Sequence, residues 1–509
     1  MKTIHTFGAE IEKPVSDIKT QQPHGVTQNF FKKIYDQAEK RRTHPHNHQS
    51  DIEPETTVGI TSDDLGEQGI DHGFNILETA SIVHTSLESL NKALWLDLKT
   101  TQETLAKENA TVINFSNHPL GKTDLGTYKK FVAPKGLYPF MWFRGWNFTA
   151  SINANAQNSP ATGITVDNSA DAVSAIIGAG AAFIALFGNS PIVNGKISKY
   201  KESRVTMWDI VMKYSKLEGD RITARFPETR FKTLAQYFLW AFGHTTGMHF
   251  ALDNTTNGND YKNLGDRVLF TPFYPSVLEF LKQPEWDMYY FTDLQKNFPF
   301  KRVAKVKPNI THLEVLQWAH FAGARVRFGL QDQNNFPLND FLQAIKNPNK
   351  KDVEKIFEKF TKFMYIEGRD PGANFPDEEI WNAGEDIAKS VLIAPSTLQK
   401  GLLYNLEKTI QYIDSFVWQD LNKLRDGAIQ KGLDGKIEKI SVKEFTENIL
   451  DLAKNGLTKE EQTYLAYPKW VFEKNQNGAD RALNYVKYFK GSEKEAIKSL
   501  IKKREVLIK

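Results

Sequence analysis

The stretch Phe7-Gly-Ala-Glu-Ile-Glu12 gives the clearest indication of the fold, because it alternates between apolar and acidic residues. Successive side chains of a β-strand point to opposite faces, so Glu10 and Glu12 share one face. The other face is apolar and is suited to a protein core: Phe7, Ala9 and Ile11. We therefore predict a strand over residues 3–14, broken by its terminal proline, that presents an acidic face.

Two later segments repeat this alternation with other polar groups. In Ser151-Ile-Asn-Ala-Asn155 the hydroxyl and amide side chains share one face, and in Arg325-Val-Arg-Phe328 the two guanidinium groups do. Each pattern taken alone is typical of a sheet with one solvated side. If the strands predicted at 3–14, 148–155 and 325–330 adjoin in one sheet, their acidic, amide and basic faces form one polar floor.

Such a floor has the chemistry of a phosphoryl-transfer site. Carboxylate oxygens are the ligands that Mg²⁺ prefers, amides position hydroxyls or a nucleotide, and arginines neutralise phosphate oxygens. Glu78, on a strand predicted at 73–79, adds a third oxygen ligand to Glu10 and Glu12. The chain has no Walker-type glycine loop and no protein-kinase motif set, so we expect the nucleotide to lie against the sheet and its metals.

Composition restricts the chemistry further. The 509 residues are 40% hydrophobic and 25% charged, as in an ordinary globular protein, and a net charge of +4 does not favour nucleic acid as a partner. The absence of cysteine excludes disulfides, thiolate nucleophiles and zinc–thiolate sites. The longest apolar run, residues 172–187, is too short for a membrane-spanning helix. We therefore expect no membrane partner and a cytoplasmic protein.

The remaining pattern favours an α+β fold. Apolar residues recur at helical spacing in three segments: 27–41, 87–98 and 168–187. Two further segments, 204–211 and 234–242, have ordered patterns, whereas 255–266 is a predicted Gly/Asn-rich loop. From Asn339 onward the patterns are mainly helical. We predict a catalytic portion over 1–338 and a largely helical C-terminal portion over 339–509, packed on the same unit.

A motif in the middle of the chain is more specific than the strand faces. It reads Ala185-Leu-Phe-Gly-Asn-Ser-Pro191, followed by Gly195-Lys196, Ser203-Arg204 and Trp208-Asp209. This motif resembles that of the glutamate–cysteine ligases of the plant and proteobacterial type. Three other segments match the same family in order: a Glu-x-Glu strand at 8–13, a Gly-Leu-Leu-Tyr region at 392–404 and a Leu-Ala-Lys-x-Gly-Leu element at 452–457.

The resemblance implies a fold and a reaction. Members of the family have a glutamine-synthetase-like fold, in which a curved antiparallel sheet is backed by helices. They use ATP and Mg²⁺ to phosphorylate the side-chain carboxylate of glutamate, and the amine of cysteine then displaces phosphate to form γ-glutamylcysteine for glutathione synthesis. The expected partners are therefore small molecules, and the protein is expected to be a monomer or a homodimer.

The resemblance also implies roles for individual residues. The implied metal ligands are Glu10, Glu12 and Glu78. The implied ATP-binding residues are Asn153, Asn155, Arg325 and Arg327. The implied substrate-binding residues are Arg144, Ser203, Arg204 and Trp208. Arg204 falls on the arginine expected to bind the α-carboxylate of glutamate and Arg327 on a phosphate-facing arginine, so these two are the expected catalytic residues.

Two departures from the family pattern leave alternatives open. The family often has Glu-x-Arg where this chain has Arg325-Val-Arg327, so a base replaces an expected acid. Asp71 and Glu78 are one residue further apart than the corresponding acid pair in plant-type members. These changes affect the expected number of metals and the identity of the amine. The alternatives are a carboxylate–amine ligase with another acceptor, or a non-catalytic relative that binds nucleotide or a partner.

Overall fold

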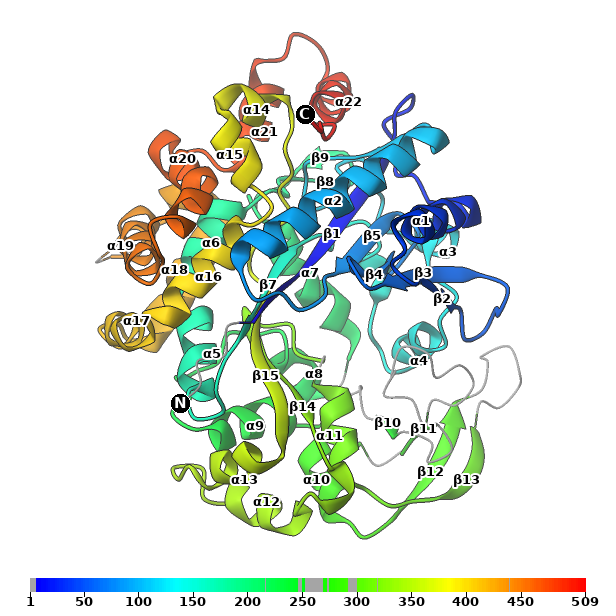
Figure 1. Ribbon diagram of the computed structural model, residues 1–509, viewed down its shortest axis with the longest axis vertical. Helices are drawn as coiled ribbons and strands as arrows, with labels where there is room; N and C mark the ends of the chain where they lie inside the picture. Colours follow the sequence, from blue (N-terminus) through cyan, green and yellow to red (C-terminus); the bar gives the residue numbers. More distant parts are fainter. Residues whose placement is uncertain are drawn as a thin grey trace.

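A large antiparallel sheet forms the centre of the protein (Figure 1). The computed structural model describes residues 6–215, 217–245, 250–251, 269–271, 274–291, 300–317, 319–438 and 440–509; the loop predicted at 255–266 lies outside them. Within these residues nine strands join one sheet, in which β6 (Ala110–Val112) pairs with the end of β1. The other eight follow the spatial order β14 (Ala324–Leu330), β15 (Thr361–Gly368), β7 (Asn158–Gly163), β1 (Phe7–Asp17), β5 (Ile76–Ala80), β4 (Gly66–Ile70), β3 (Thr57–Ser62) and β2 (His46–Gln49).

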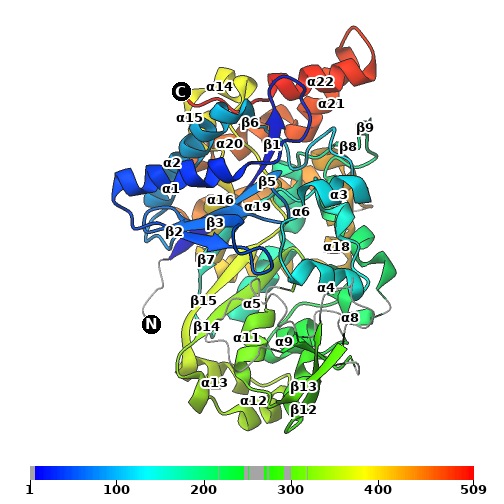
Figure 2. The ribbon, with the colours of Figure 1, turned by 90° about the vertical axis from the view of Figure 1, so that its right-hand side faces the viewer.

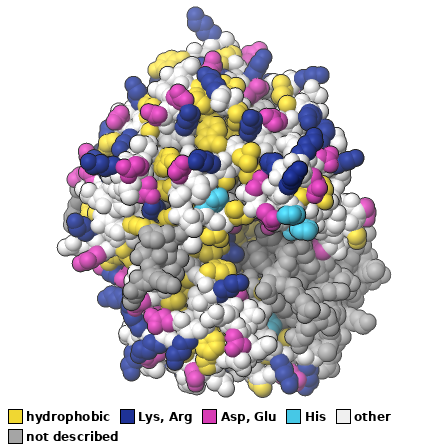
Figure 3. Space-filling model, viewed as in Figure 1, with side chains coloured by type: hydrophobic (Ala, Val, Ile, Leu, Met, Phe, Trp, Pro, Cys, Tyr) yellow, Lys and Arg dark blue, Asp and Glu magenta, His cyan; other side chains and the backbone are white. Residues whose placement is uncertain are grey.

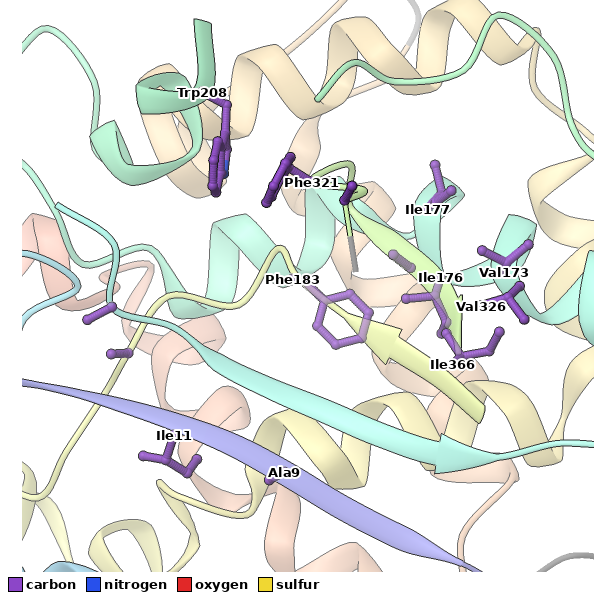
Figure 4. Close-up of a cluster of buried hydrophobic side chains, with 14 of the residues drawn as sticks. Ala9, Ile11, Val173, Ile176, Ile177, Phe183, Trp208, Phe321, Val326 and Ile366 are labelled. Carbon is purple, nitrogen blue, oxygen red and sulfur yellow. The ribbon is translucent and has the colours of Figure 1, made fainter. Parts of the chain in front are cut away.

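Strand β1 has the two faces that its sequence predicts. Phe7, Ala9 and Ile11 are buried in the main hydrophobic core, whereas Glu10 and Glu12 line a cavity on the other side of the sheet. Figure 4 shows part of this core, where Ile176 lies near Val326 of β14 and Ile366 of β15. A strand period of two is therefore enough to place both acidic side chains.

Helices back the core side of the sheet, as Figures 1 and 2 show. The helices that pack on it are α1 (Gln28–Arg41), α2 (Leu87–Leu105), α5 (Ser169–Gly178) and α16 (Ala394–Tyr404). The apolar side chains Leu87, Leu90, Leu94 and Leu98 recur on one face of α2 and are all buried. The predicted α+β class, an antiparallel sheet backed by helices, is confirmed.

The apolar run at 168–187 forms two helices instead of the single helix predicted. Helix α5 ends at Gly178, and α6 (Gly180–Phe187) continues at an angle of 47°. Both are buried in the protein core. Among the described residues no single helix is long and apolar enough to cross a membrane, and this bent pair would reach that length only together.

One prediction about a strand is wrong. Residues 148–155 do not form a strand: Phe148–Ala150 is a 3₁₀-helix and turns follow it, because Asn75 donates its amide to the backbone carbonyl of Ile152 and holds the chain in a compact loop. The C-terminal portion also contributes to the sheet. Its strand β15 pairs with both β14 and β7. The division of the chain at residue 338 stays a prediction.

The remaining elements surround this framework, and basic and acidic side chains are interspersed over the face seen in Figure 3. The short strands are β8 (Ile192–Val193) with β9 (Lys196–Ile197), and a separate small sheet of β10 (Phe250–Ala251), β11 (Leu269–Phe270), β12 (Trp286–Phe291) and β13 (Phe300–Val306). The helices of the first two thirds are α3 (Leu125–Phe131), α4 (Leu137–Phe143), α7 (Ser203–Val211), α8 (Glu218–Ile222), α9 (Leu234–Phe242), α10 (Val277–Lys282), α11 (Ile310–Leu316), α12 (Leu338–Ile345) and α13 (Asp352–Phe360). Those of the last third are α14 (Glu378–Ala383), α15 (Glu385–Ser390), α17 (Leu406–Ile413), α18 (Trp418–Lys431), α19 (Val442–Asn455), α20 (Ala466–Lys474), α21 (Gly478–Tyr488) and α22 (Glu493–Lys503).

A buried ion pair fixes α2 against the sheet directly behind the acidic face. The Lys13 ammonium donates to Asp97 of α2 at 2.6 Å and to the Thr79 hydroxyl at 2.6 Å. The Gln68 amide donates to the same carboxylate at 2.7 Å. Three adjacent strands, β1, β5 and β4, are thus joined through one side chain of α2, which holds them at the register that the cavity side requires.

We expect Asp97→Asn to lower the free energy of unfolding by about 3–5 kcal/mol, because it leaves the Lys13 charge buried without its counter-ion. Urea unfolding measures this change. The matched control on the same helix is Glu103→Gln. The Glu103 carboxylate is exposed and lies as far as 4.0 Å from Lys99, so this substitution should lower the free energy of unfolding by less than about 0.5 kcal/mol. Equal effects of the two substitutions would show that the buried Lys13–Asp97 pair contributes no more to the free energy of unfolding than an exposed carboxylate does.

Candidate active site

A cavity of about 600 Å³ opens on the side of the sheet opposite the backing helices. Its floor consists of side chains from β1, β5, β4 and β14. Its walls come from α4 and the loop before it, from the 3₁₀ turn at 148–150, from α7 and from Phe321. Carboxylates occupy one part of the floor and arginines another, which is the arrangement expected from the sequence.

The acidic part of the floor is a group of three carboxylates. Glu12 of β1 and Glu78 of β5 are direct cross-strand partners, and Asp71 approaches them from the loop between β4 and β5. One oxygen from each residue lies within 4.8 Å of the other two. Glu12 and Glu78 were predicted as metal ligands; Asp71 was not, and Glu10 lines the same cavity outside this group. The prediction therefore named two of the three members.

Electrostatics at this group favour a cation. Burial, together with the negative charges of Asp71 and Glu78, raises the pKa of Glu12 well above its usual range. The Gln157 backbone N–H donates to Glu12 at 3.1 Å, and the Asn155 amide donates to Asp71 at 2.6 Å. Two carboxylates are thus oriented by neutral donors, and the positive charges of Arg369 and Arg204 only partly offset the negative charge at Glu12. A hard divalent cation with oxygen ligands fits this donor set.

Three arginines form the basic part of the floor and share one carboxylate. Arg325 of β14 holds Glu367 of β15 through two hydrogen bonds, of 2.9 and 2.6 Å. Arg369 donates to the same carboxylate at 2.9 Å, and Arg327 approaches it to 3.6 Å. All three arginines line the cavity. Glu10 lines the same cavity and its charge also acts on Arg325, so three positive charges face two negative ones at this end of the cavity.

Glu367 supplies an acid beside Arg325 and Arg327, where the segment 325–327 itself has none. Burial alone would raise its pKa, but the three guanidinium groups outweigh burial and lower it to about 2. The residue was missed in the sequence because a Glu-x-Arg pattern, expected at 325–327, occurs 42 residues later as Glu367-Gly-Arg369. The two strands are neighbours in the sheet, and Arg325 and Glu367 are paired in register.

We expect Glu367→Gln to lower the free energy of unfolding by about 3–5 kcal/mol, because three buried or partly buried cations lose their shared counter-ion. Since the folded-state pKa of Glu367 lies below the ordinary value of 4.5, its stabilisation is present above pH 4.5 and is lost as pH falls towards 2. The wild-type and variant unfolding curves should therefore converge over that range. Glu358→Gln, on the exposed face of α13, is the control; a constant gap between Glu367→Gln and the wild type from pH 5 to pH 2 would contradict this account.

Aromatic side chains form one wall of the cavity. Trp208 of α7 stacks on Phe321 with ring centroids 3.8 Å apart, and Figure 4 shows the two rings face to face. The Arg369 guanidinium lies over the Phe321 ring, 5.7 Å from the ring centroid. Trp208 was predicted to shape the substrate pocket, and the structure places it in the cavity wall.

A buried histidine lies in the opposite wall. His72 accepts or donates through Nδ1 to the Ser151 hydroxyl at 2.7 Å, and its Nε2 has no hydrogen-bond partner among the described residues. Burial lowers the pKa of His72 to about 4, so the ring is neutral at physiological pH. Lys135, a buried lysine, also lines the cavity. The sequence offered no spacing signal for either residue.

Arg204, predicted to bind the α-carboxylate of glutamate, is bonded to the protein on every side in this structure. Arg204 does not line the cavity. Its guanidinium donates to Glu202 at 2.8 Å, to Gln157 at 3.1 Å and to the backbone carbonyl of Asp370 at 2.8 Å. Every nitrogen of the group is thus bonded to the protein. We propose that Arg204 instead positions the segments on either side of the cavity, since Gln157 contacts Glu12 and residue 370 follows Arg369.

Three other predicted site residues also lie outside the cavity lining. Asn153 binds the carbonyl of Lys122 and the amide of Asn75, so both ends of its side chain are occupied. Ser203 bonds to the Ser198 hydroxyl at the start of α7. Arg144 packs among aromatic rings, 4.3 Å from that of Tyr274, and burial lowers its pKa to about 10. By contrast, Asn155 and Arg325 do line the cavity.

The fold and the cavity define a class of protein. In this class an antiparallel sheet is backed by helices, and its other face carries carboxylates and arginines in one polar site. The model of glutamate-cysteine ligase family 2 (GCS2) matches residues 39–326, more than half of the chain. The chain therefore belongs to this family. The matched segment includes Asp71, Glu78 and Arg325, while Glu12 and Glu367 lie outside it.

Two solved structures are similar to the chain at low sequence identity. A glutamate–cysteine ligase from Francisella tularensis in complex with AMP has a TM-score of 0.49 and 12% identity, and the match covers 98% of this chain and 88% of that protein. A bifunctional glutathione synthetase from Pasteurella multocida has a TM-score of 0.43 and 10% identity, and the match covers 97% of this chain and 51% of that protein. The sequence matches no curated protein.

Proposed function

We propose that the protein is an ATP- and Mg²⁺-dependent ligase that phosphorylates the γ-carboxylate of glutamate and joins it to the amine of cysteine. The observation that carries the proposal is one cavity with a three-carboxylate group and a three-arginine group on its floor, in a member of the glutamate–cysteine ligase family. A cation-binding end and an anion-binding end are what a metal–nucleotide complex and an acyl phosphate require.

The acidic group would hold Mg²⁺. Glu12, Asp71 and Glu78 would supply three oxygen ligands, and the pKa of Glu12 is raised by burial and by repulsion from the other two carboxylates, a repulsion that a cation would relieve. When bound, Mg²⁺ supplies charge neutralisation on phosphate oxygens. Asn155 keeps Asp71 in place from behind, so the loop residue is oriented towards the two strand residues.

The arginines would neutralise the transferred phosphate. Arg325 is held in two hydrogen bonds by Glu367, whereas Arg327 is 3.6 Å from that carboxylate and is more exposed. We therefore assign phosphate contact to Arg327 and Arg369, and assign to Arg325 and Glu367 the task of aligning them. Planar guanidinium groups are suited to this contact because they donate two parallel hydrogen bonds.

The walls would protect the reaction from water. An acyl phosphate hydrolyses if water reaches it, and the stack of Trp208 on Phe321 gives the cavity a dry aromatic side. The reaction needs no covalent enzyme nucleophile, because the phosphate group activates the carboxylate. A chain without cysteine is compatible with this chemistry.

The test follows ADP release while ATP, Mg²⁺ and glutamate are held fixed and the amine is varied over cysteine, ammonia, glycine and a set of longer amines. We expect release that depends on both glutamate and amine, with the highest kcat/KM for cysteine. Preference for another amine would keep the ligase class and reject the cysteine assignment. Nucleotide binding without amine-dependent turnover would reject the enzyme proposal.

A further inference from the structure

A second cavity, of about 550 Å³, lies between α14, α21 and α22. In both views these last two helices are at the upper end of the molecule, and β14 and β15 are towards its lower end (Figures 1 and 2). None of the residues that line it lines the catalytic cavity. Four basic side chains and two carboxylates face it: Arg481, Lys490, Lys503, Arg504, Asp377 and Glu379.

Two of the basic side chains are buried arginines with unused donors. Arg481 and Arg504 are 6% and 2% exposed. Both Nη atoms of Arg504, and Nε and Nη2 of Arg481, have no hydrogen-bond partner among the described residues. The hydrogen bonds that these two guanidinium groups make are long: 3.4 Å from Arg504 to Asp377 and 3.4 Å from Arg481 to the Gln476 carbonyl. Buried guanidinium groups with so few acceptors are costly unless an anion joins them.

The nearby carboxylates are not sufficient to supply that anion. Asp377 already accepts the Asn114 amide at 2.7 Å and the backbone N–H of Ile380 at 3.0 Å, where it caps α14. Glu379 approaches Arg481 only to 3.7 Å, and its side chain is 46% exposed. The other neighbours of the arginines are uncharged: Phe115 lies under Arg504, Trp470 lies under Arg481, and the Tyr467 hydroxyl interacts with Arg481. These rings orient the guanidinium planes but accept little hydrogen bonding.

We propose that this cavity binds a small molecule through a carboxylate or phosphate group held between Arg481 and Arg504. Its volume is in the range of ligand pockets, about 300–1,000 Å³. Tyr485 and Phe489 border the same space and offer an apolar surface to the rest of the ligand. The site is independent of the proposed reaction, because it shares no residue with the catalytic cavity.

Crystals of the full chain soaked in selenate test the position, and thermal unfolding with inorganic phosphate or succinate tests binding in solution, against potassium chloride at equal ionic strength. We expect an anomalous peak within hydrogen-bond distance of both arginines and stabilisation by at least one of the two anions. Stabilisation by phosphate alone or by succinate alone identifies the oxyanion that the site prefers. Arg504→Gln should weaken binding about 10- to 100-fold, because charge-assisted hydrogen bonds are lost.

A second variant keeps the test valid if Arg504→Gln does not fold. Lys503 is exposed at the rim of the cavity, so Lys503→Gln should fold normally and weaken anion binding several-fold. Lys494→Gln, on the same helix outside the cavity lining, is the matched control and should bind as the wild type does. A peak confined to the catalytic cavity, binding at crystal concentration only, or unchanged affinity in Lys503→Gln would overturn the proposal.

Discussion

Glu12→Gln is expected to lower kcat by about 10³-fold, because it removes one oxygen charge from the group that would hold Mg²⁺, and metal stabilisation of a phosphoryl group is worth several kcal/mol. Glutamine has nearly the same shape and can still accept the Gln157 N–H, so the sheet should be undisturbed. Steady-state ADP release at saturating Mg²⁺, ATP and glutamate measures the loss. The control is Glu67→Gln, an exposed carboxylate that lines the same cavity.

The same substitution should have the opposite effect on stability. The folded-state pKa of Glu12 is raised, so the protonated carboxyl group favours the folded state. This contribution is complete below pH 4.5 and is lost as pH rises through the raised pKa. In metal-free buffer at pH 7.5, Glu12→Gln should therefore be at least as stable as the wild type. Mg²⁺ should raise the Tm of the wild type and leave that of the variant nearly unchanged. A variant that retains wild-type kcat would exclude the metal-ligand assignment.

Arg327→Gln is expected to lower kcat by about 10²- to 10³-fold, the usual cost of removing one group that stabilises developing charge. Arg327 is partly exposed in the cavity and comes no closer than 3.6 Å to Glu367. Its loss should therefore leave the Tm within a few degrees of the wild type. Stopped assays with saturating ATP and glutamate give kcat, and thermal unfolding gives Tm.

Arg325→Gln provides the contrast to this variant. Arg325 is buried and bonded twice to Glu367, so its loss should lower stability strongly as well as activity. Arg221→Gln, an exposed arginine of α8, controls for the removal of a guanidinium group elsewhere. If Arg327→Gln kept kcat within threefold of the wild type, phosphate contact would have to be withdrawn from Arg327 and left to Arg369.

Local periodicity was sufficient where a strand or helix carries its own two-sided pattern. The alternation in Phe7–Asp17 placed Glu10 and Glu12 in the cavity, and the pattern of Ala324–Leu330 placed Arg325 and Arg327 there. The same reasoning failed at 148–155, where polar and apolar residues also alternate. There, hydrogen bonds from Asn75 to Ile152 and Asn153 hold the chain in turns, and no local pattern encodes those distant contacts.

Pairing between distant strands accounts for most of what was missed. Glu367 joins the site because β15 pairs with β14, and Asp71 because the loop before β5 folds back towards β1. Resemblance to the family identified Arg204 as important, yet the structure shows that all of its bonds go to the protein. Sequence motifs thus indicate which residues matter, whereas the target of each side chain depends on the packing around it.

Transfer of ¹⁸O from glutamate to inorganic phosphate is the direct test of whether the enzyme phosphorylates the γ-carboxylate. Glutamate labelled with ¹⁸O in both γ-carboxylate oxygens is incubated with the enzyme, ATP, Mg²⁺ and cysteine, and the phosphate released is analysed by mass spectrometry. If the γ-carboxylate is phosphorylated in this cavity, one ¹⁸O atom appears in inorganic phosphate for each γ-glutamyl amide formed. Unlabelled phosphate, or label recovered in AMP, would contradict the account.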